Sequence, residues 1–222
     1  EHALAVHSEL ERLRGPSPTV LMSHFACADN PLNPMTQRQI QAFDEAVSGI
    51  PGPVSLANSA AILNFPGSHR DFIRPGIMLY GVSPSISKPA AELGLDPVMT
   101  LQCDLIAINQ CKKGDSIGYG AAYRCSQDMP VGVAAIGYGD GYPRQAKNGT
   151  PVLLNGRRAE IVGHVSMDMI TIDLRGHERA KVGDQVTLWG PDLPVEEVSQ
   201  WCDAIPYQLI CGVTARVKSV VC

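Results

Sequence analysis

The sequence predicts an α/β region followed by a mainly antiparallel β domain, and two observations carry this prediction. Residues 1–82 alternate between helical and strand periods of hydrophobic residues, an order typical of parallel βα units. From about residue 95 this pattern gives way to short apolar runs separated by turn signals. Residues 83–94 lie between the two patterns and are the expected linker. We therefore expect a first domain at 1–82 and a second at 95–222.

The first region is expected to alternate helices with three strands. Its first helix carries leucines near one face and ends at Gly15. Thr36 and Gln39 resemble the capping box that starts the second helix, which ends before Gly49. The expected strands are 19–26, 53–57 and 76–80, and a third, short helix is expected at 58–63. Three strands cannot close a barrel, so this region is open or incomplete.

The second region is expected to be a series of short strands with one helix. Asn155-Gly156 lies between two apolar runs and is the strongest hairpin signal in the chain, because this pair favours a tight two-residue turn. Gly114 and Gly183 mark two further turns. The expected strands are 99–108, 131–136, 152–154, 158–162, 169–174, 185–189 and 215–222, and the expected helix is 195–202.

Composition excludes several classes of function. The 222 residues have a formal charge of −4 and no run of Lys or Arg, so the sequence does not support binding to nucleic acid or to an anionic membrane. No apolar stretch reaches the roughly 20 residues that cross a bilayer. The seven cysteines are odd in number and contain no Cys-x-x-Cys pair. This argues against a disulfide scaffold or a zinc ribbon and favours a cytoplasmic location.

A metal site is not expected either. His164, Asp168 and Asp173 are residue types that bind metals, but alternation along a strand does not bring all three to one point. The chain begins with Glu1 and has no signal-peptide pattern, and its last residues follow no cap or turn signal. We therefore expect it to be a piece of a longer protein.

A glycine-rich loop is the first candidate for chemistry. Gly137-Tyr-Gly-Asp-Gly-Tyr-Pro-Arg144 follows an apolar strand, and glycines at alternate positions let the backbone approach a ligand while Tyr138 and Asp140 are displayed. The spacing differs from the dinucleotide pattern and no helix follows. The alternative is a plain glycine turn with an exposed tyrosine.

Three other candidates lie near the strand ends of the first region. Arg74 precedes Pro75-Gly76-Ile77, where free amides can hold an anion, although a structural turn with a solvated Arg is the alternative. Asn58-Ser59 lies between a strand and a helix, so Ser59 is either a helix N-cap or a phosphate contact. His24 ends an apolar strand, where βα sites collect functional groups, but a lone His is more often a core residue.

Six motifs in this order resemble the alanine racemase family, of the bacterial, fold-type III pyridoxal-phosphate kind. The resemblance covers essentially all 222 residues. The motifs are Ser23-His-Phe-Ala26, Ala57-Asn-Ser-Ala-Ala61, Arg74-Pro-Gly-Ile-Met-Leu-Tyr-Gly81, Ile117-Gly-Tyr-Gly120, Ile136-Gly-Tyr-Gly-Asp-Gly-Tyr-Pro143 and Val162-Gly-His-Val-Ser-Met-Asp168.

The resemblance implies the C-terminal part of a (β/α)8 TIM barrel that binds pyridoxal 5'-phosphate, followed by the family's β domain. It also implies a head-to-tail homodimer in which each site pairs one subunit's barrel with the other's β domain. The family's lysine motif, Lys-Ala-Asn-Ala-Tyr-Gly-His-Gly, does not occur in these residues, so the Schiff-base lysine would lie outside this chain. We therefore expect the chain to be inactive alone.

Residue roles follow from the same resemblance. Tyr138 matches the catalytic tyrosine that exchanges the α-proton on one face of the substrate, while the lysine serves the other face. Met167 matches a backbone contact to the substrate carboxylate. The residues that match cofactor contacts are His24, Asn58, Ser59, Arg74, Gly76 and Ile77. Arg74 matches the residue that faces the pyridine nitrogen, and His24 and Arg74 match positions linked to the catalytic tyrosine through a chain of hydrogen bonds.

Two positions depart from the family pattern. His164 stands where many relatives have Arg near the mouth of the substrate site, and Ala215 stands where some place a phosphate-binding Tyr. The implied activity is interconversion of L- and D-alanine, which supplies D-alanine for peptidoglycan. The alternatives are a racemase that accepts serine or a broader set of amino acids, and a non-catalytic module that only binds the cofactor.

Overall fold

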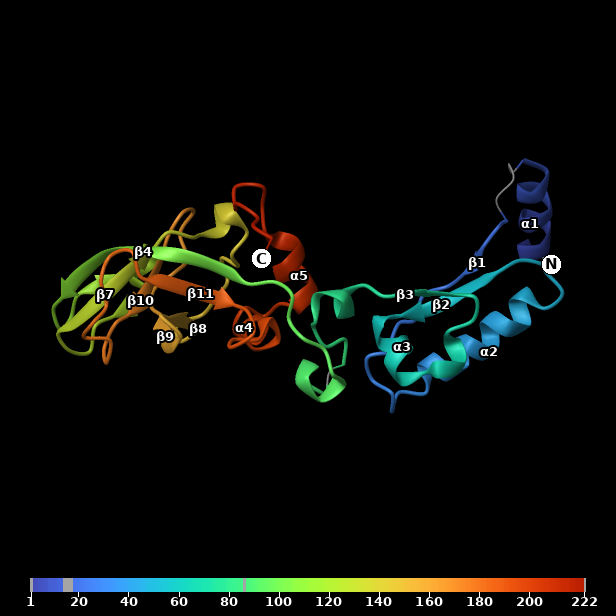
Figure 1. Ribbon diagram of the computed structural model, residues 1–222, viewed down its shortest axis with the longest axis horizontal. Coiled ribbons are helices and arrows are strands. Elements are labelled where there is room, and N and C mark those ends of the chain that lie inside the picture. Colours follow the sequence, from blue (N-terminus) through green and yellow to red (C-terminus); the bar gives the residue numbers. More distant parts are fainter. Residues whose placement is uncertain (1, 14–17, 86, 222) are drawn as a thin grey trace. The chain divides into compact units, whose positions relative to one another are not determined.

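The computed structural model describes residues 2–13, 18–85 and 87–221 (Figure 1). The chain divides into two compact units, residues 1–95 (unit 1) and 96–222 (unit 2). In the part of the chain that is described, no helix is both long and apolar enough to cross a membrane.

Unit 1 is built from parallel βα units, and this confirms the first part of the predicted fold class. Its sheet has the order β1-β2-β3, and β2 pairs in parallel with both neighbours. Its elements are α1 (His2–Leu13), β1 (Leu21–Met22), α2 (Met35–Val47), β2 (Val54–Asn58), α3 (Ser59–Asn64) and β3 (Phe72–Arg74), followed by short 3-10 helices that include Ile77–Tyr80 and Ala90–Leu93.

The core of unit 1 is small and rich in alanine. Phe25 and Leu56 are its large buried members, and Ile40 and Phe43 of α2 pack against them. The other buried members are Ala28, Ala57, Ala60 and Ala61. Short side chains on β2 and at the start of α3 therefore let the helix follow the strand closely.

Two of the strands expected in unit 1 are wrong. The strand expected at 19–26 is only Leu21–Met22, because the chain leaves the sheet edge after Met22 and turns to bury Phe25. The strand expected at 76–80 is instead the 3-10 helix Ile77–Tyr80, and the third strand comes earlier as β3. Pro75, which lacks an N–H group, separates β3 from the turn. Gly15 lies outside the described residues.

The capping box expected at Thr36 and Gln39 is also absent from α2, whose N-cap is Pro34 without a side-chain hydrogen bond. Gln39 instead bonds to the segment after β1. Its Oε1 accepts from the Ala26 N–H at 3.0 Å and its Nε2 donates to the His24 carbonyl at 3.2 Å. A tertiary contact has therefore taken the side chain that the local pattern assigned to a cap.

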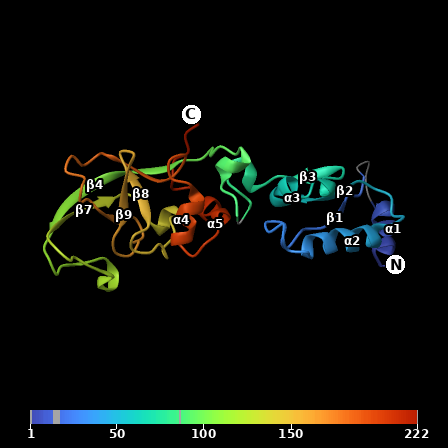
Figure 2. The same cartoon turned by 90° about the horizontal axis from the view of Figure 1, so that it is seen from below.

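Unit 2 is a closed antiparallel barrel with the strand order β10-β7-β4-β11-β8-β9, which confirms the second part of the predicted fold class (Figures 1 and 2). Asn155 and Gly156 both have positive φ in the predicted β8–β9 turn. Its strands are β4 (Leu101–Cys111), β7 (Met129–Ala134), β8 (Pro151–Leu154), β9 (Arg157–Ile161), β10 (Ile170–Asp173) and β11 (Gln185–Trp189), with the pair β5 (Ser116–Ile117) and β6 (Tyr123–Arg124) between β4 and β7.

The last part of unit 2 differs from expectation. The helix expected at 195–202 is α4 (Val195–Trp201), but a second helix, α5 (Pro206–Gly212), was not expected. Pro206 favours this helix start because its fixed φ suits the first turn. Residues 215–221 form no strand, since Thr214 turns the chain: its carbonyl accepts from the Val217 N–H at 3.1 Å.

Candidate functional site

Arg74, at the end of β3, holds a cluster of polar groups at one edge of the unit 1 sheet. Its Nη1 donates to Ser55 Oγ at 2.6 Å, and its Nη2 donates to the carbonyls of Ser23 at 2.8 Å and Leu56 at 3.3 Å. Nη2 also lies 3.4 Å from His24 Nδ1. The guanidinium is therefore fixed where the three parallel strands end, and the alternative of a solvated arginine is wrong.

Asn58 extends this cluster from the end of β2. Its Nδ2 lies 3.4 Å from His24 Nε2, and its Oδ1 accepts from the Ala61 N–H at 3.0 Å. Asn58, and not Ser59, is thus the N-cap of α3. The exposed His24 ring lies between Asn58 and Arg74, so the alternative of a core histidine is also wrong.

Ser59 joins the start of α3 to the turn after β3. Its hydroxyl is buried and accepts from the Gly76 N–H at 2.8 Å. This bond brings together the first turn of α3, whose leading amides have no acceptor within the helix, and the start of the 3-10 helix at Ile77. Backbone N–H groups gathered in this way can hold a phosphate. The residues present therefore fit a cofactor with a phosphate close to a fixed guanidinium.

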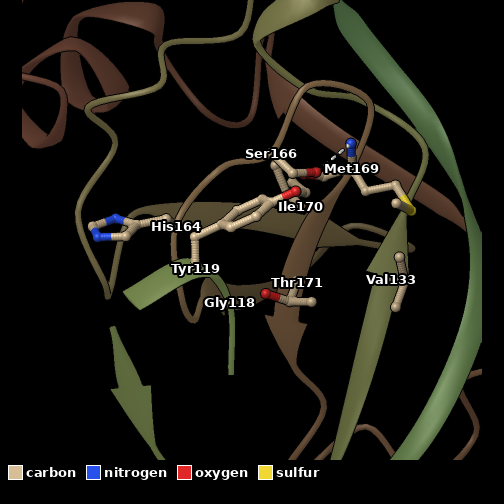
Figure 3. A pocket seen from close by; sticks show the side chains of 8 residues that line it. All are labelled: Gly118, Tyr119, Val133, His164, Ser166, Met169, Ile170 and Thr171. Atoms are coloured by element: carbon tan, nitrogen blue, oxygen red, sulfur yellow. Dashed lines mark hydrogen bonds between the residues drawn. The ribbon is translucent and has the colours of Figure 1, made fainter. Parts of the chain in front are cut away.

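A cavity of about 430 Å³ opens in unit 2, at the side of the barrel. Figure 3 shows the ring of Tyr119 lying across it, with the hydroxyl directed toward the turn formed by Ser166 and Met169. Ser166 Oγ donates to the Met169 carbonyl at 2.8 Å and accepts from the Met169 N–H at 3.1 Å, which closes this turn. The lining residues are Gly118, Tyr119, Val133, His164, Ser166, Met169, Ile170 and Thr171.

Tyr138 and Met167 lie on two neighbouring loops of unit 2. The Tyr138 N–H donates to the Ser166 carbonyl at 3.0 Å, and the Gly139 N–H donates to the Met167 carbonyl at 2.8 Å. Both side chains are partly exposed, at 39% for Tyr138 and 52% for Met167. Among the described residues, the cavity lining includes neither of them.

Arg216 ties these two loops together. Its Nη2 donates to Asp168 Oδ1 at 2.6 Å, and its Nε lies 3.3 Å from Asp140 Oδ1. The hydrogen bond to Asp168, with the nearby Asp140 charge, raises the pKa of this guanidinium further. Asp140 Oδ2 also accepts from the Gly137 N–H at 2.9 Å, which closes the tyrosine loop on itself.

Glycine is required in the tyrosine loop by close backbone approach. A Cβ on Gly137 would lie 2.3 Å from the Ser166 carbonyl oxygen. Gly141 has φ +99°, and a Cβ there would lie 1.9 Å from the Gly212 carbonyl oxygen. The alternate glycines of the sequence thus pack the loop against two other segments, and only Tyr138 projects.

The structure brings His24, Asn58, Ser59, Arg74, Gly76 and Ile77 together in unit 1 and places Tyr138 and Met167 in unit 2. Sequence reasoning missed Ser55, Tyr119 and Arg216. A signal for Tyr119 was present, because Gly118-Tyr119-Gly120 repeats the triplet found at 137–139. No local signal pointed to Ser55 or Arg216, whose partners lie far away in the sequence.

Fold and cluster together define the class of this protein: part of a (β/α)8 barrel with a guanidinium-centred cluster at its strand ends, followed by an antiparallel β domain. Residues 1–84 match the family model for the N-terminal domain of alanine racemase, and residues 98–221 match the model for its C-terminal domain. The chain belongs to the alanine racemase family.

Individual relatives agree with this assignment. The chain is 56% identical over 198 residues to an alanine racemase of Nitrosococcus oceani, covering 89% of this chain and 55% of the relative. It resembles the biosynthetic alanine racemase of Pseudomonas aeruginosa with a TM-score of 0.90 and 46% identity, covering 96% of this chain and 60% of that one.

A third relative bears on the cofactor. The alanine racemase of Bartonella henselae, whose structure contains covalently bound pyridoxal phosphate, matches with a TM-score of 0.82 and 31% identity, covering 90% of this chain and 56% of that one. The chain spans about half the length of the curated relatives it matches.

Proposed function

We propose that this chain is part of an enzyme that interconverts L- and D-alanine with pyridoxal 5'-phosphate. The observation that carries the proposal is the cluster around Arg74, where a fixed guanidinium stands beside the turn formed by Ser59 and Gly76. Alanine is proposed as substrate because the relatives are alanine racemases. The role in supplying D-alanine for peptidoglycan is part of the same proposal.

Unit 1 would hold the cofactor. When bound, pyridoxal phosphate makes the α-proton of an attached amino acid acidic enough to be removed. The Ser59 hydroxyl and the Ile77 N–H would hold the phosphate, and Gly76 would complete the turn through its bond to Ser59. Arg74 would face the ring nitrogen, and because a guanidinium keeps its proton, it would donate a hydrogen bond there without protonating the ring. His24 and Asn58 would keep Arg74 in position.

Unit 2 would supply groups to the substrate. The Met167 N–H has no acceptor among the described residues, while its carbonyl is taken by Gly139. This supports the predicted contact to the substrate carboxylate. We propose that the site is shared in a homodimer, in which the β domain of one subunit meets the barrel of the other. The cytoplasmic location rests on the cysteine pattern and stays a prediction.

Two tyrosines are candidates for the base that exchanges the α-proton. The resemblance assigned this role to Tyr138, whose hydroxyl projects from the glycine loop. The cavity supports Tyr119 more strongly, because its ring lies across an apolar hollow of a size that can take a small substrate, whereas Tyr138 does not line it (Figure 3). We therefore propose Tyr119 as the base and keep Tyr138 as the competing assignment.

The test uses a protein of the relatives' full length that contains this chain. We expect it to racemise alanine in both directions with added cofactor, and we expect the 222 residues alone to be inactive because the family's lysine lies outside them. Tyr119→Phe should lower turnover by about 10²-fold or more, the usual contribution of a positioned base. Tyr138→Phe is the matched variant, because it removes the same hydroxyl from the neighbouring loop.

Several outcomes would change the proposal. Unchanged rates for both variants would exclude Tyr119 and Tyr138 as the base, and a larger loss for Tyr138→Phe would restore the assignment made from sequence. Faster turnover of serine than alanine would favour the broader racemase. A full-length protein that binds the cofactor but racemises neither amino acid would favour the non-catalytic module.

A further inference from the structure

Two cysteines meet at the base of the segment that carries Tyr119. Cys111 is the last residue of β4, and Cys125 follows β6 directly. Cys125 is buried in a small apolar cluster with Ile117, Met129 and Val131, and the partly buried Cys111 packs against the same cluster. The two cysteines therefore bracket residues 112–124 and share one packed environment.

Backbone bonds hold the two ends of this segment together. The Gly114 N–H donates to the Cys125 carbonyl at 2.8 Å, and the Cys125 N–H donates to the Asp115 carbonyl at 2.8 Å. Asp115 in turn donates from its N–H to the Lys112 carbonyl at 3.0 Å, which makes a tight turn directly after Cys111. This short path brings the chain on either side of the two cysteines together, and both side chains pack in the same cluster.

The two thiols differ in access. Cys125 is 2% exposed, and burial, followed by the neighbouring Cys111, raises the pKa of its thiol. Cys111 is only partly buried, so it is the thiol that a small reagent reaches first. An accessible thiol beside a buried one is the arrangement of an attacking and a resolving cysteine.

We propose that Cys111 and Cys125 form a reversible disulfide when the protein meets hydrogen peroxide, and that this bond closes the base of the Tyr119 segment. The Cys111 thiolate attacks one peroxide oxygen, so that an S–O bond forms, the O–O bond breaks and hydroxide leaves. The Cys125 sulfur then attacks the Cys111 sulfur, so that the S–S bond forms and the oxygen departs as water. In total two thiols lose two electrons and two protons, and one peroxide becomes two waters.

The bond would restrict a segment that projects from the barrel. Figure 2 shows the yellow-green chain between β4 and β7 extending beyond the ends of these strands. Backbone bonds to Cys125 and the bond from the Lys113 N–H to Asp128 hold its base. Further out it has the short β5–β6 pair and one bond from Asn148 Nδ2 to the Ala122 carbonyl. A covalent link there would reduce the conformations open to residues 112–124 and thus to Tyr119. This inference concerns the thiols alone and stands whether or not the proposed racemase activity is correct.

Peptide mapping of the full protein tests the proposal. Trypsin cleaves after Lys112, Lys113 and Arg124, so Cys111 and Cys125 fall on separate peptides. The Cys111 peptide also contains Cys103, so fragmentation of the linked pair in the mass spectrometer is used to assign the bond to Cys111 or Cys103. After brief treatment with peroxide and alkylation of the remaining thiols, we expect one linked pair of these two peptides, which disappears on treatment with dithiothreitol. Hydrogen exchange of the amides at 116–124 should slow in the oxidised protein.

Two variants serve as controls. Cys125→Ala should abolish the linked pair and the slowed exchange, whereas Cys211→Ser, which removes an exposed thiol, should leave both unchanged. The proposal is overturned if Cys111 accumulates as sulfinic or sulfonic acid while Cys125 stays reduced, or if Cys111 links to another cysteine. The peptide mapping of the parent protein decides the question by itself, even if the Cys125→Ala variant fails to fold.

Discussion

The two units of this chain reach stability in different ways. Unit 2 closes six of its strands into a barrel that has no free sheet edge. Among the described residues, the large side chains buried most completely lie almost entirely within unit 2, Trp189 and Tyr142 among them. The rings of these two residues stack with their centroids 6.2 Å apart. Unit 1 has an open sheet of three strands and a core made mostly of alanine.

The surface of unit 1 shows the consequence. Met22 on β1 is 62% exposed, and Phe72 and Ile73 on β3 are both about half exposed. Parallel sheets are usually covered on both faces, so these exposed apolar side chains are suited to packing against additional protein. The comparison teaches that unit 2 can bury its own core, whereas unit 1 depends on additional cover to do the same.

Separating the units should give the largest effect. We expect residues 96–222, expressed alone, to unfold in one cooperative thermal transition, because their barrel closes on itself. Residues 1–95 should show no such transition, since their few large buried side chains cannot offset the conformational entropy of the chain. Circular dichroism and hydrogen exchange measure both. A sharp transition in the isolated 1–95 segment would contradict the comparison.

Truncating the barrel core should have the next largest effect. Leu188 of β11 is fully buried, and Leu188→Ala should lower the free energy of unfolding of unit 2 by about 3–5 kcal/mol through lost burial and a cavity. Urea denaturation of the 96–222 segment measures this. Val182→Ala, at an exposed position, is the control and should change stability by less than about 0.5 kcal/mol. Similar losses for both variants would show that the barrel core is not tightly packed.

Removing a helix cap should have a smaller effect, confined to unit 1. Asn58→Ala deletes the acceptor for the Ala61 N–H and should destabilise α3 by about 1 kcal/mol. Asn58→Asp keeps this acceptor and should retain most of the stability. Hydrogen exchange at Ala61 in the full chain is the measurement. Equal exchange rates in the parent and in Asn58→Ala would mean that the cap does not hold this helix.

A surface ion pair at the end of the barrel should give the smallest effect. The hydrogen bond from Lys112, together with one from the Lys113 N–H, lowers the pKa of Asp128. A lowered pKa in the folded state adds stability above the ordinary carboxyl pKa of about 4, and this is lost as the pH falls through the lowered value. Asp128→Asn should therefore slightly reduce the stability of unit 2 at pH 7. Near pH 3 the difference in stability between this variant and the parent should become smaller. Asp192→Asn, at an exposed loop position, is the control and should shift the acid unfolding midpoint less.

Much of the barrel of unit 2 was predictable from local patterns. The six barrel strands lie close to the expected ranges, because each carries its own hydrophobic run and is bounded by its own turn residues. Asn155 and Gly156 adopt the positive φ that these two residue types tolerate better than others. Unit 1 was harder, since β1 and β3 are very short and are defined by their pairing with β2 more than by their own residues.

The sequence by itself determined the βα-to-β order of the chain, the family resemblance, and the set of residues that gathers at the strand ends around Arg74. Only the tertiary structure decided that Gln39 bonds to the segment after β1, that Arg216 joins the loops of Tyr138 and Met167, and that Tyr119 lies across the cavity. The physical reason is that hydrophobic period and turn chemistry act over a few neighbouring residues. Hydrogen bonds and cavities form between segments that are far apart in the sequence, and the local sequence of either segment does not indicate that they meet.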